Sequence, residues 1–158
     1  MPKQVDHVER RREVAGAVLR LVARQGVSAV TLKDVSVESS WSRGVLTHFF
    51  GNKDSLLEAA LRHGMWEASE ALGRAAQTPN SCDALRLVLE EALPVDDRRI
   101  AFLRVYVAYL AEAMHSERLR EYFGYNHQFW RQQLRSTVER GQHAGEIPQH
   151  LDPQAAAE

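Results

Sequence analysis

The chain has 158 residues, and its 44% hydrophobic and 26% charged residues are ordinary for a water-soluble globular protein. Cys82 is the only cysteine, which excludes a disulfide framework and favours a reducing compartment. No segment approaches the roughly 18 consecutive apolar residues of a membrane span, and the basic N-terminus lacks the apolar stretch of a signal peptide. We therefore expect a cytoplasmic protein without a membrane partner.

Charge is distributed unevenly along the chain. Residues 1–54 hold nine Lys or Arg and six Asp or Glu, a net charge of +3 in a chain whose total is −1. A basic part joined to an acidic part suits one domain that meets nucleic acid and another that avoids phosphates. The excess is small, and an ordinary solvated surface explains it equally well.

The first predicted helix covers residues 7–25. Apolar side chains recur there at helical spacing, and Gly26 is placed to end the helix: the stripe consists of Val14, Val18, Leu21 and Val22.

A short second helix is predicted to begin after Thr31. Thr31 can cap its N-terminus while Asp34 returns a bond to the cap, and Val30 with Val35 fits a hydrophobic staple. Serine competes for backbone hydrogen bonds, so the helix should end near Ser39-Ser40.

A third helix follows within a few residues. Ser42 is its predicted N-cap, and Gly44–Phe50 gives it only about two turns. Either Val45 or Leu46, together with Phe49, forms the inward side. Two short helices around a tight turn are the build of a helix-turn-helix, in which the second helix reads the DNA major groove. The residues left facing outward are Arg43, Gly44, Thr47 and His48.

The remainder also has helical periodicity. Asn52 should cap a long helix that reaches about Ala76, with an inner face of Leu56, Leu57, Ala60, Leu61 and Met65. Ser81 should cap a helix over residues 82–93, which Pro94 ends. Residues 97–115 are apolar nearly all round, which predicts a central, buried helix. Another long helix should cover residues 117–143, with a kink near Gly124 as an open alternative. Asp152-Pro153 then opens a last helix. The predicted fold class is all-α.

The stretch VTLKDVSVESSWSRGVLTHFFGNKDSLLEAAL resembles the DNA-binding domain of TetR-family transcriptional regulators. Ten residues fall on the family's usual positions: Thr31, Val35, Ser36, Ser42, Gly44, Leu46, Phe50, Lys53, Leu56 and Leu57. Two positions depart from the pattern. Ser40-Trp41 stands where relatives have Gly-Val, and Thr47 replaces a usual Tyr. Thr followed by His is familiar in the betaine-type branch.

The resemblance implies a helix-turn-helix DNA-binding domain over residues 1–52. A helical effector and dimerisation domain would follow over residues 53–158. Family members continue beyond the Asp152-Pro153 position into the helices of their dimer interface. The resemblance therefore implies either a C-terminally truncated chain or a naturally shortened regulator. The family forms homodimers, and we expect the short C-terminus to weaken the dimer of this chain.

For DNA contacts, Arg43 is the predicted base-reading residue, because a guanidinium can bond guanine through two hydrogen bonds. Gly44 would allow close backbone approach, and Trp41, large for its position, would either overpack the domain or reach towards DNA. The alternative is a solvated three-helix unit with no nucleic-acid role. The predicted phosphate or shallow groove contacts are Thr31, Lys33, Ser42, Thr47, His48 and Lys53.

For the effector, the family resemblance implies a pocket in the second domain. Phe102, Tyr106 and Tyr109 share one helix face, and the two phenols are the preferred candidates because a buried hydroxyl needs a hydrogen-bond partner. An aromatic cage for a cationic effector is one hypothesis, and ordinary core packing is the alternative for each ring. The other aromatic candidates are Trp66, Phe123, Phe129 and Trp130.

Enzyme motifs are missing from the sequence. The seven histidines show no metal-ligand spacing, and the sequence has no GxSxG, phosphate-binding Gly loop or dinucleotide fingerprint. We expect no catalytic residues, metal or cofactor.

The expected function is that of a TetR-type regulator. It would be a repressor that binds a palindromic double-stranded operator as a homodimer and leaves it when a small molecule binds. The alternatives are a truncated regulator with weak DNA binding and a ligand-binding or interaction module whose DNA reading has lapsed. Operator sequence, effector identity and the sign of regulation do not follow from the residues.

Overall fold

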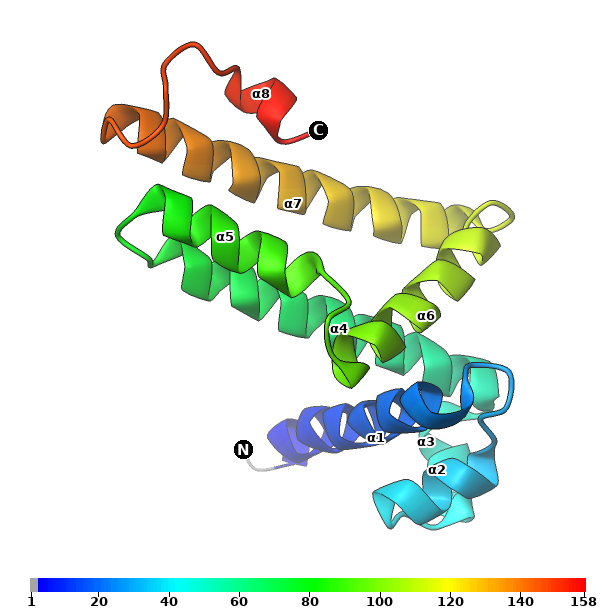
Figure 1. Cartoon of the computed structure of the whole chain (residues 1–158). Helices are drawn as coiled ribbons and strands as arrows, with labels where there is room; N and C mark the ends of the chain where they lie inside the picture. The colour runs from blue at the N-terminus through cyan, green and yellow to red at the C-terminus, as the bar shows by residue number, and fades with distance from the viewer. Residues whose placement is uncertain (1–2) are drawn as a thin grey trace. The chain divides into compact units, whose positions relative to one another are not determined.

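A computed structural model describes residues 3–158, with side chains described from Val8 onward. Every regular element in that range is a helix, which confirms the all-α prediction (Figure 1). The helices are α1 (Lys3–Gln25), α2 (Leu32–Ser39), α3 (Arg43–Phe50), α4 (Lys53–Ala76), α5 (Ser81–Ala92), α6 (Asp97–Glu112), α7 (Glu117–His143) and α8 (Pro153–Ala156).

The helices divide into two compact units. The first contains the chain up to Trp66 together with Pro94–Ala111, so most of α6 groups with α1, α2, α3 and the first half of α4. The second contains Glu67–Leu93 and Glu112–Glu158. The predicted domain boundary after residue 52 stays a prediction.

The caps of α2 form as the sequence predicts. The Thr31 hydroxyl accepts a bond from the Asp34 amide at 3.2 Å, and the Asp34 carboxylate accepts one from the Thr31 amide at 3.1 Å. Val30 and Val35, the predicted staple, are both buried. The helix ends at Ser39, whose hydroxyl donates to the Val35 carbonyl, so local bonding fixes both ends of α2.

Ser40 ends α2 in the left-handed region, with φ of 60° and ψ of 19°. It is the one non-glycine residue with positive φ among the described residues. This conformation costs a residue with a Cβ about 1–2 kcal/mol, whereas glycine adopts it freely. The backbone is therefore strained at the position where the family pattern has glycine.

Replacing Ser40 with glycine should raise the free energy of unfolding by up to about 1 kcal/mol. The relief of strain exceeds the entropy that an additional glycine gives the unfolded chain, which is about 0.4–1 kcal/mol. Thermal and urea unfolding of wild type and Ser40→Gly measure the change. A clear loss of stability would mean that the serine side chain contributes a bond worth more than the strain.

The core of the first unit comes from the predicted apolar faces. The α1 stripe is buried, with Val14, Val18 and Val22 fully covered, and Gly26 ends that helix at φ of 79°. The predicted inner face of α4, from Leu56 to Met65, is buried as well. Figure 1 shows α2 and α3 beside one another, with α1 against them.

Helix boundaries agree with the predictions at α4 and α7 and differ by one residue at α5. Asn52 caps α4, and its side-chain oxygen accepts from the Ser55 amide at 2.9 Å. At α5 the predicted cap Ser81 is wrong: Asn80 caps the helix by accepting from the Asp83 amide at 3.0 Å. Ser81 is instead the buried first residue, and its amide donates to the Glu146 carboxylate. An Asn directly before a Ser offers two capping residues, and tertiary packing selects between them.

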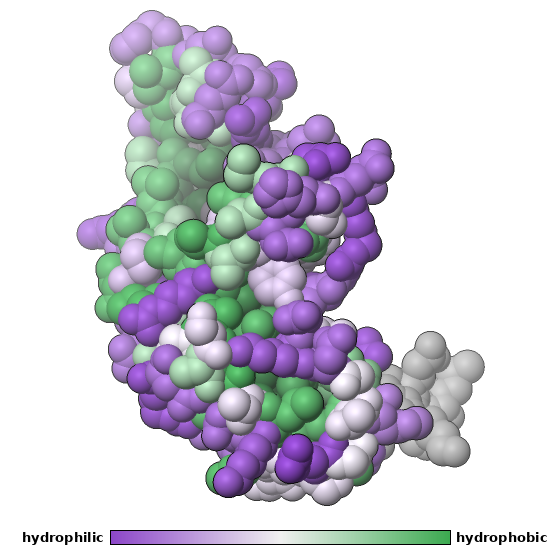
Figure 2. Space-filling model, turned by 90° about the vertical axis from the view of Figure 1, so that its right-hand side faces the viewer, coloured by the Kyte–Doolittle hydropathy of each residue, from purple (hydrophilic) through white to green (hydrophobic). Residues whose placement is uncertain are grey.

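The prediction of a helix buried on all sides over residues 97–115 is wrong. Helix α6 ends at Glu112, and only Ala101 and Val105 are buried along it. Leu103, Val107 and Leu110 are 42–54% exposed. Figure 2 shows hydrophobic residues reaching the surface among hydrophilic ones on the face in view. Apolar composition around a helix thus does not secure neighbours on every side.

The second unit is built around α5 and α7, which lie side by side (Figure 1). Leu72, Ala75, Ala84 and Val88 form its buried cluster. Helix α7 runs unbroken through Gly124. Helix α8 begins as predicted, with Asp152 accepting from the Gln154 amide at 2.9 Å and Pro153 in the first turn.

Candidate DNA interface and effector site

Helix α3 presents a polar, exposed side. Arg43, Gly44, Thr47 and His48 are all exposed, as the sequence predicts. Leu46 is the only buried residue of α3, which settles the open choice of inward residue, since Val45 is 39% exposed. The Ser42 hydroxyl caps the helix by accepting from the Val45 amide at 3.3 Å. The outward side therefore carries a cation, a hydroxyl and an imidazole on one short helix.

Three other candidates belong to neighbouring segments of the chain. Lys33 is exposed in the first turn of α2. The Thr31 hydroxyl donates to the Asp34 carboxylate at 2.6 Å, and this bond is the main cause of the lowered pKa of Asp34. Lys53 donates from Nζ to the Ser28 carbonyl at 2.7 Å. Thr31 and Lys53 thus already make hydrogen bonds within the free protein. To contact DNA, each would have to bind a phosphate in addition to its present partner.

Trp41 is half-buried and held from three helices. Its carbonyl accepts a bond from the Ser36 hydroxyl of α2 at 2.6 Å. Its ring meets Phe49 of α3 edge to face at 5.9 Å, and the Arg10 guanidinium of α1 lies 5.7 Å from the ring centre. The residue that departs from the family pattern therefore connects α1, α2 and α3.

An ion-pair cluster fastens α2 to α1. Glu38 accepts from Arg20 at 2.7 Å and from Arg24, and these bonds, Arg24 first, hold the pKa of Glu38 below its ordinary value. The two arginine side chains are more than half exposed, so solvent screening keeps their contribution to stability small. The cluster therefore links α2 to α1 with only a small stabilising effect.

Four aromatic candidates for the effector site lie in the first unit. Phe102 and Tyr106 of α6 pack ring to ring at 5.9 Å, and burial raises the pKa of Tyr106. The Tyr109 hydroxyl donates to the Asp54 carbonyl at 2.6 Å, so this phenol has a backbone partner. Trp66 is 39% exposed, and the Arg12 guanidinium lies 3.8 Å from its ring centre.

The other three candidates lie in the second unit and pack mainly into its core. Phe129 and Trp130 lie against the buried Leu72 and Val88 cluster, and Phe123 is 6% exposed. These surroundings favour core packing for the three rings, which is the alternative interpretation of the aromatic pattern.

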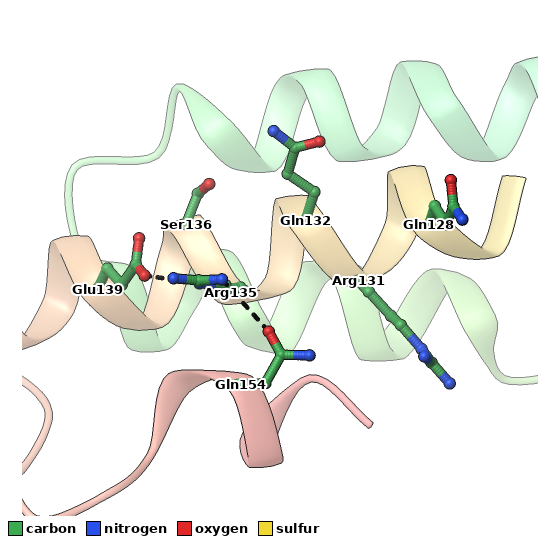
Figure 3. Close-up of a pocket in the computed structure, with 7 residues that line it drawn as sticks. All are labelled: Gln128, Arg131, Gln132, Arg135, Ser136, Glu139 and Gln154. Atoms are coloured by element: carbon green, nitrogen blue, oxygen red, sulfur yellow. Dashed lines mark hydrogen bonds and ion pairs between the residues drawn. The ribbon is translucent and has the colours of Figure 1, made fainter. Parts of the chain in front are cut away.

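A groove of about 460 Å³ in the second unit runs along α7 beside α8 (Figure 3). Arg135 bonds Glu139 at 2.8 Å and Gln154 at 3.3 Å across it. None of the aromatic candidates lines this groove, whose side chains are polar: Gln128, Arg131, Gln132, Arg135, Ser136, Glu139 and Gln154. Its polar lining does not suit an apolar or aromatic cage.

Sequence reasoning missed two sets of contacts that involve α1. The run Arg10-Arg11-Arg12 of α1 lies over three rings, Trp41, Phe50 and Trp66. Arg104 of α6 donates to the Val22 and Ala23 carbonyls at 3.1 and 3.0 Å, in the last turn of α1. The only sequence signal was the arginine run itself, which does not reveal its partners.

Neither a metal site nor a membrane-spanning helix is found among the described residues. Residues 3–158 contain no group of His, Cys, Asp or Glu side chains arranged to hold a metal ion. No helix in the described range is long and apolar enough to cross a membrane.

Two family models match the chain. The model for bacterial regulatory proteins of the tetR family matches residues 16–60, which include the two short helices and their turn. The model for the C-terminal part of BetI-type transcriptional repressors matches residues 82–158. The chain belongs to the TetR family. The two matches also confirm the resemblance to the betaine-type branch, and both models describe regulators, in line with the expectation that the chain is not an enzyme.

Curated relatives support the assignment. The HTH-type transcriptional regulator BetI of Paraburkholderia xenovorans is 33% identical over 124 residues, covering 76% of this chain and 63% of the relative. BetI of Burkholderia thailandensis is 32% identical over 122 residues, with the same coverage. The match to these TetR-family relatives spans just under two thirds of their length.

Solved structures share the TetR fold. A TetR-family regulator from Rhodococcus sp. matches with a TM-score of 0.68 at 25% identity, over 95% of this chain and 80% of the other. A regulator from Saccharomonospora viridis, solved in complex with choline, matches with a TM-score of 0.77 at 22% identity, over 95% and 78%.

Proposed function

We propose that this TetR-family chain is a transcriptional repressor that binds a palindromic operator as a homodimer. The observation that carries the proposal is the exposed side of α3, with Arg43, Gly44, Thr47 and His48 displayed on a capped, two-turn helix. A helix of this size enters the major groove with its N-terminal residues against base edges. Arg43, its first residue, has the chemistry to read guanine, and Lys33 and Lys53 to meet phosphates.

The alternative of a lapsed DNA-reading domain gains no support from the turn. Ser40 keeps the left-handed conformation, α2 and α3 keep their caps, and Trp41 is accommodated by packing. Since the proposed target is DNA, we place the protein in the cytoplasm.

Selection of duplexes from a random pool tests this function and yields the operator sequence in the same experiment. The purified protein should enrich a sequence with two-fold symmetry and half-sites about one helical turn, or a multiple of it, apart. Anisotropy titrations against a scrambled duplex at fixed salt should then show roughly a thousand-fold or greater preference. Failure to enrich any sequence would support the lapsed module instead.

For the effector, we propose a small quaternary ammonium cation. Support comes from the choline bound to the Saccharomonospora viridis relative and from the exposed Trp66 ring, which already holds the Arg12 cation at 3.8 Å. On α6 of the same unit, the candidates Phe102 and Tyr106 have ring centres 5.9 Å apart.

A comparison of choline with its neutral isostere 3,3-dimethylbutanol tests whether the protein recognises the charge of the effector or only its shape. Choline should weaken operator binding, and the isostere should have little effect at equal concentration, because the ring faces attract a positive charge. Equal effects of the two compounds would point to an apolar pocket, and no effect of either would exclude this class of effector.

A further inference from the structure

Three consecutive arginines on α1 meet three different aromatic rings. Arg10 lies 5.7 Å from the centre of the Trp41 ring, Arg11 lies 5.9 Å from that of Phe50, and Arg12 lies 3.8 Å from that of Trp66. All three distances fall within the ~6 Å range of cation–π attraction. Successive residues of a helix point about 100° apart, so one short run can reach three neighbours.

Two of these rings lie at the two ends of the recognition helix. Trp41 directly precedes Ser42, the N-cap of α3, and Phe50 is the last residue of α3. The third ring, on Trp66, belongs to α4. Arg10 therefore contacts the residue before the N-cap of α3, and Arg11 contacts the last residue of α3. The ring that Arg12 contacts lies outside α3.

Helix α3 buries little of its own length. It is eight residues long, and Leu46 is its only buried residue. Gly44 lowers its intrinsic helix propensity, and a helix of this length depends on tertiary contacts for its stability. A surface pocket of about 260 Å³, lined in part by Arg11, Phe49 and Phe50, leaves one side incompletely packed.

The ring contacts continue to the outward side of α3. Trp41 meets Phe49 edge to face at 5.9 Å, and Phe49 meets His48 in the same manner at 5.4 Å. A continuous series of contacts thus runs from Arg10 through Trp41 and Phe49 to His48, a proposed DNA contact.

We propose that Arg10 and Arg11 are positioning residues that clasp the recognition helix at both ends through the Trp41 and Phe50 rings. The inference deepens the proposed DNA-binding function, on which its second test rests. It also accounts for Trp41: a large ring at this turn gives the Arg10 cation a surface that a small aliphatic residue would not.

The first test uses the free protein and three matched variants, Arg10→Met, Arg11→Met and Arg12→Met. Each removes one positive charge from the same exposed run and keeps an apolar stem. Hydrogen exchange of the α3 amides, Leu46 to Gly51, should accelerate about three- to thirty-fold in the first two variants. In Arg12→Met it should stay within about twofold of wild type. The Val18 amide in the core of α1 serves as the reference for global unfolding.

A double-mutant cycle tests the pair itself. Trp41→Leu and Arg10→Met should each accelerate α3 exchange, and the double variant should exchange little faster than Trp41→Leu alone, because the ring that Arg10 contacts is already gone. Additive effects, or wild-type α3 exchange in both Arg10→Met and Arg11→Met, would overturn the proposal.

The second test separates positioning from direct phosphate contact. Arg10→Met should weaken binding to the selected operator about three- to thirty-fold, with unchanged affinity for a random duplex and an unchanged salt slope. Equal losses on both duplexes with a slope shallower by about one would identify Arg10 as a phosphate contact and overturn the proposal. If the wild-type protein shows no preference for any duplex, the proposed function fails. Hydrogen exchange still decides whether Arg10 and Arg11 stabilise α3.

Discussion

Replacing Arg43 with alanine should weaken operator binding by ~1–3 kcal/mol while leaving binding to random DNA nearly unchanged. Arg43 is exposed in the first turn of α3, where a recognition helix meets base edges, and a bidentate bond to guanine is worth about that much. Fluorescence anisotropy with the selected operator and a scrambled duplex, across a salt series, measures both quantities.

Lys53→Ala is the matched comparison for Arg43→Ala. A phosphate contact carries no sequence information, so this variant should bind all duplexes more weakly, with a salt slope shallower by about one. Lys53 also donates to the Ser28 carbonyl, so the melting temperature of the Lys53→Ala variant must be compared with that of wild type. Identical behaviour of the two variants on both duplexes would overturn the division between base reading and phosphate contact.

Replacing Gly64 with alanine should lower the free energy of unfolding by about 1–3 kcal/mol. An added Cβ would lie 2.6 Å from Cε2 and 2.8 Å from Cγ of Phe102, so the whole ring of this α6 residue would have to move. Overpacking of this kind costs more than the ~1 kcal/mol that alanine gains over glycine in a helix. Urea unfolding gives the change directly.

Gly73→Ala provides the control in the same helix. Nothing lies within 4 Å of the Cβ it would add, so this variant should become more stable by up to ~1 kcal/mol. Adding Phe102→Leu to Gly64→Ala should recover part of the loss, because the smaller side chain makes room. Equal effects of the two glycine substitutions would show that the contact between Gly64 and Phe102 does not constrain α6.

Local signals account for much of the predicted fold. The Thr31 and Asp34 capping box, the Asn52 cap and the end of α1 at Gly26 each depend on residues within about one turn of one another. The strained turn at Ser40 also follows from a local pattern. Such features survive in almost any tertiary context, which explains why the helix boundaries could be predicted closely.

The candidate effector residues show the opposite case. Seven aromatic residues at helical spacing are candidates, and the sequence does not separate lining residues from core residues. In the structure, Phe129 and Trp130 pack against a core cluster, and the Tyr109 hydroxyl bonds the Asp54 carbonyl 55 residues away. The neighbours of each ring decide its role, and those neighbours come from distant parts of the chain.

The sequence by itself determined the helical class, most of the helix boundaries and caps, and the outward residues of α3, because periodicity and capping act within one or two turns. Tertiary structure alone decided that α6 is buried along one narrow face, that Arg104 reaches the carbonyls of α1 across 82 residues, and that three adjacent arginines meet three separate rings. The physical reason is that an arginine side chain is long and exposed in any helix, and its partner is chosen by which ring or carbonyl the packing of the other helices brings within reach.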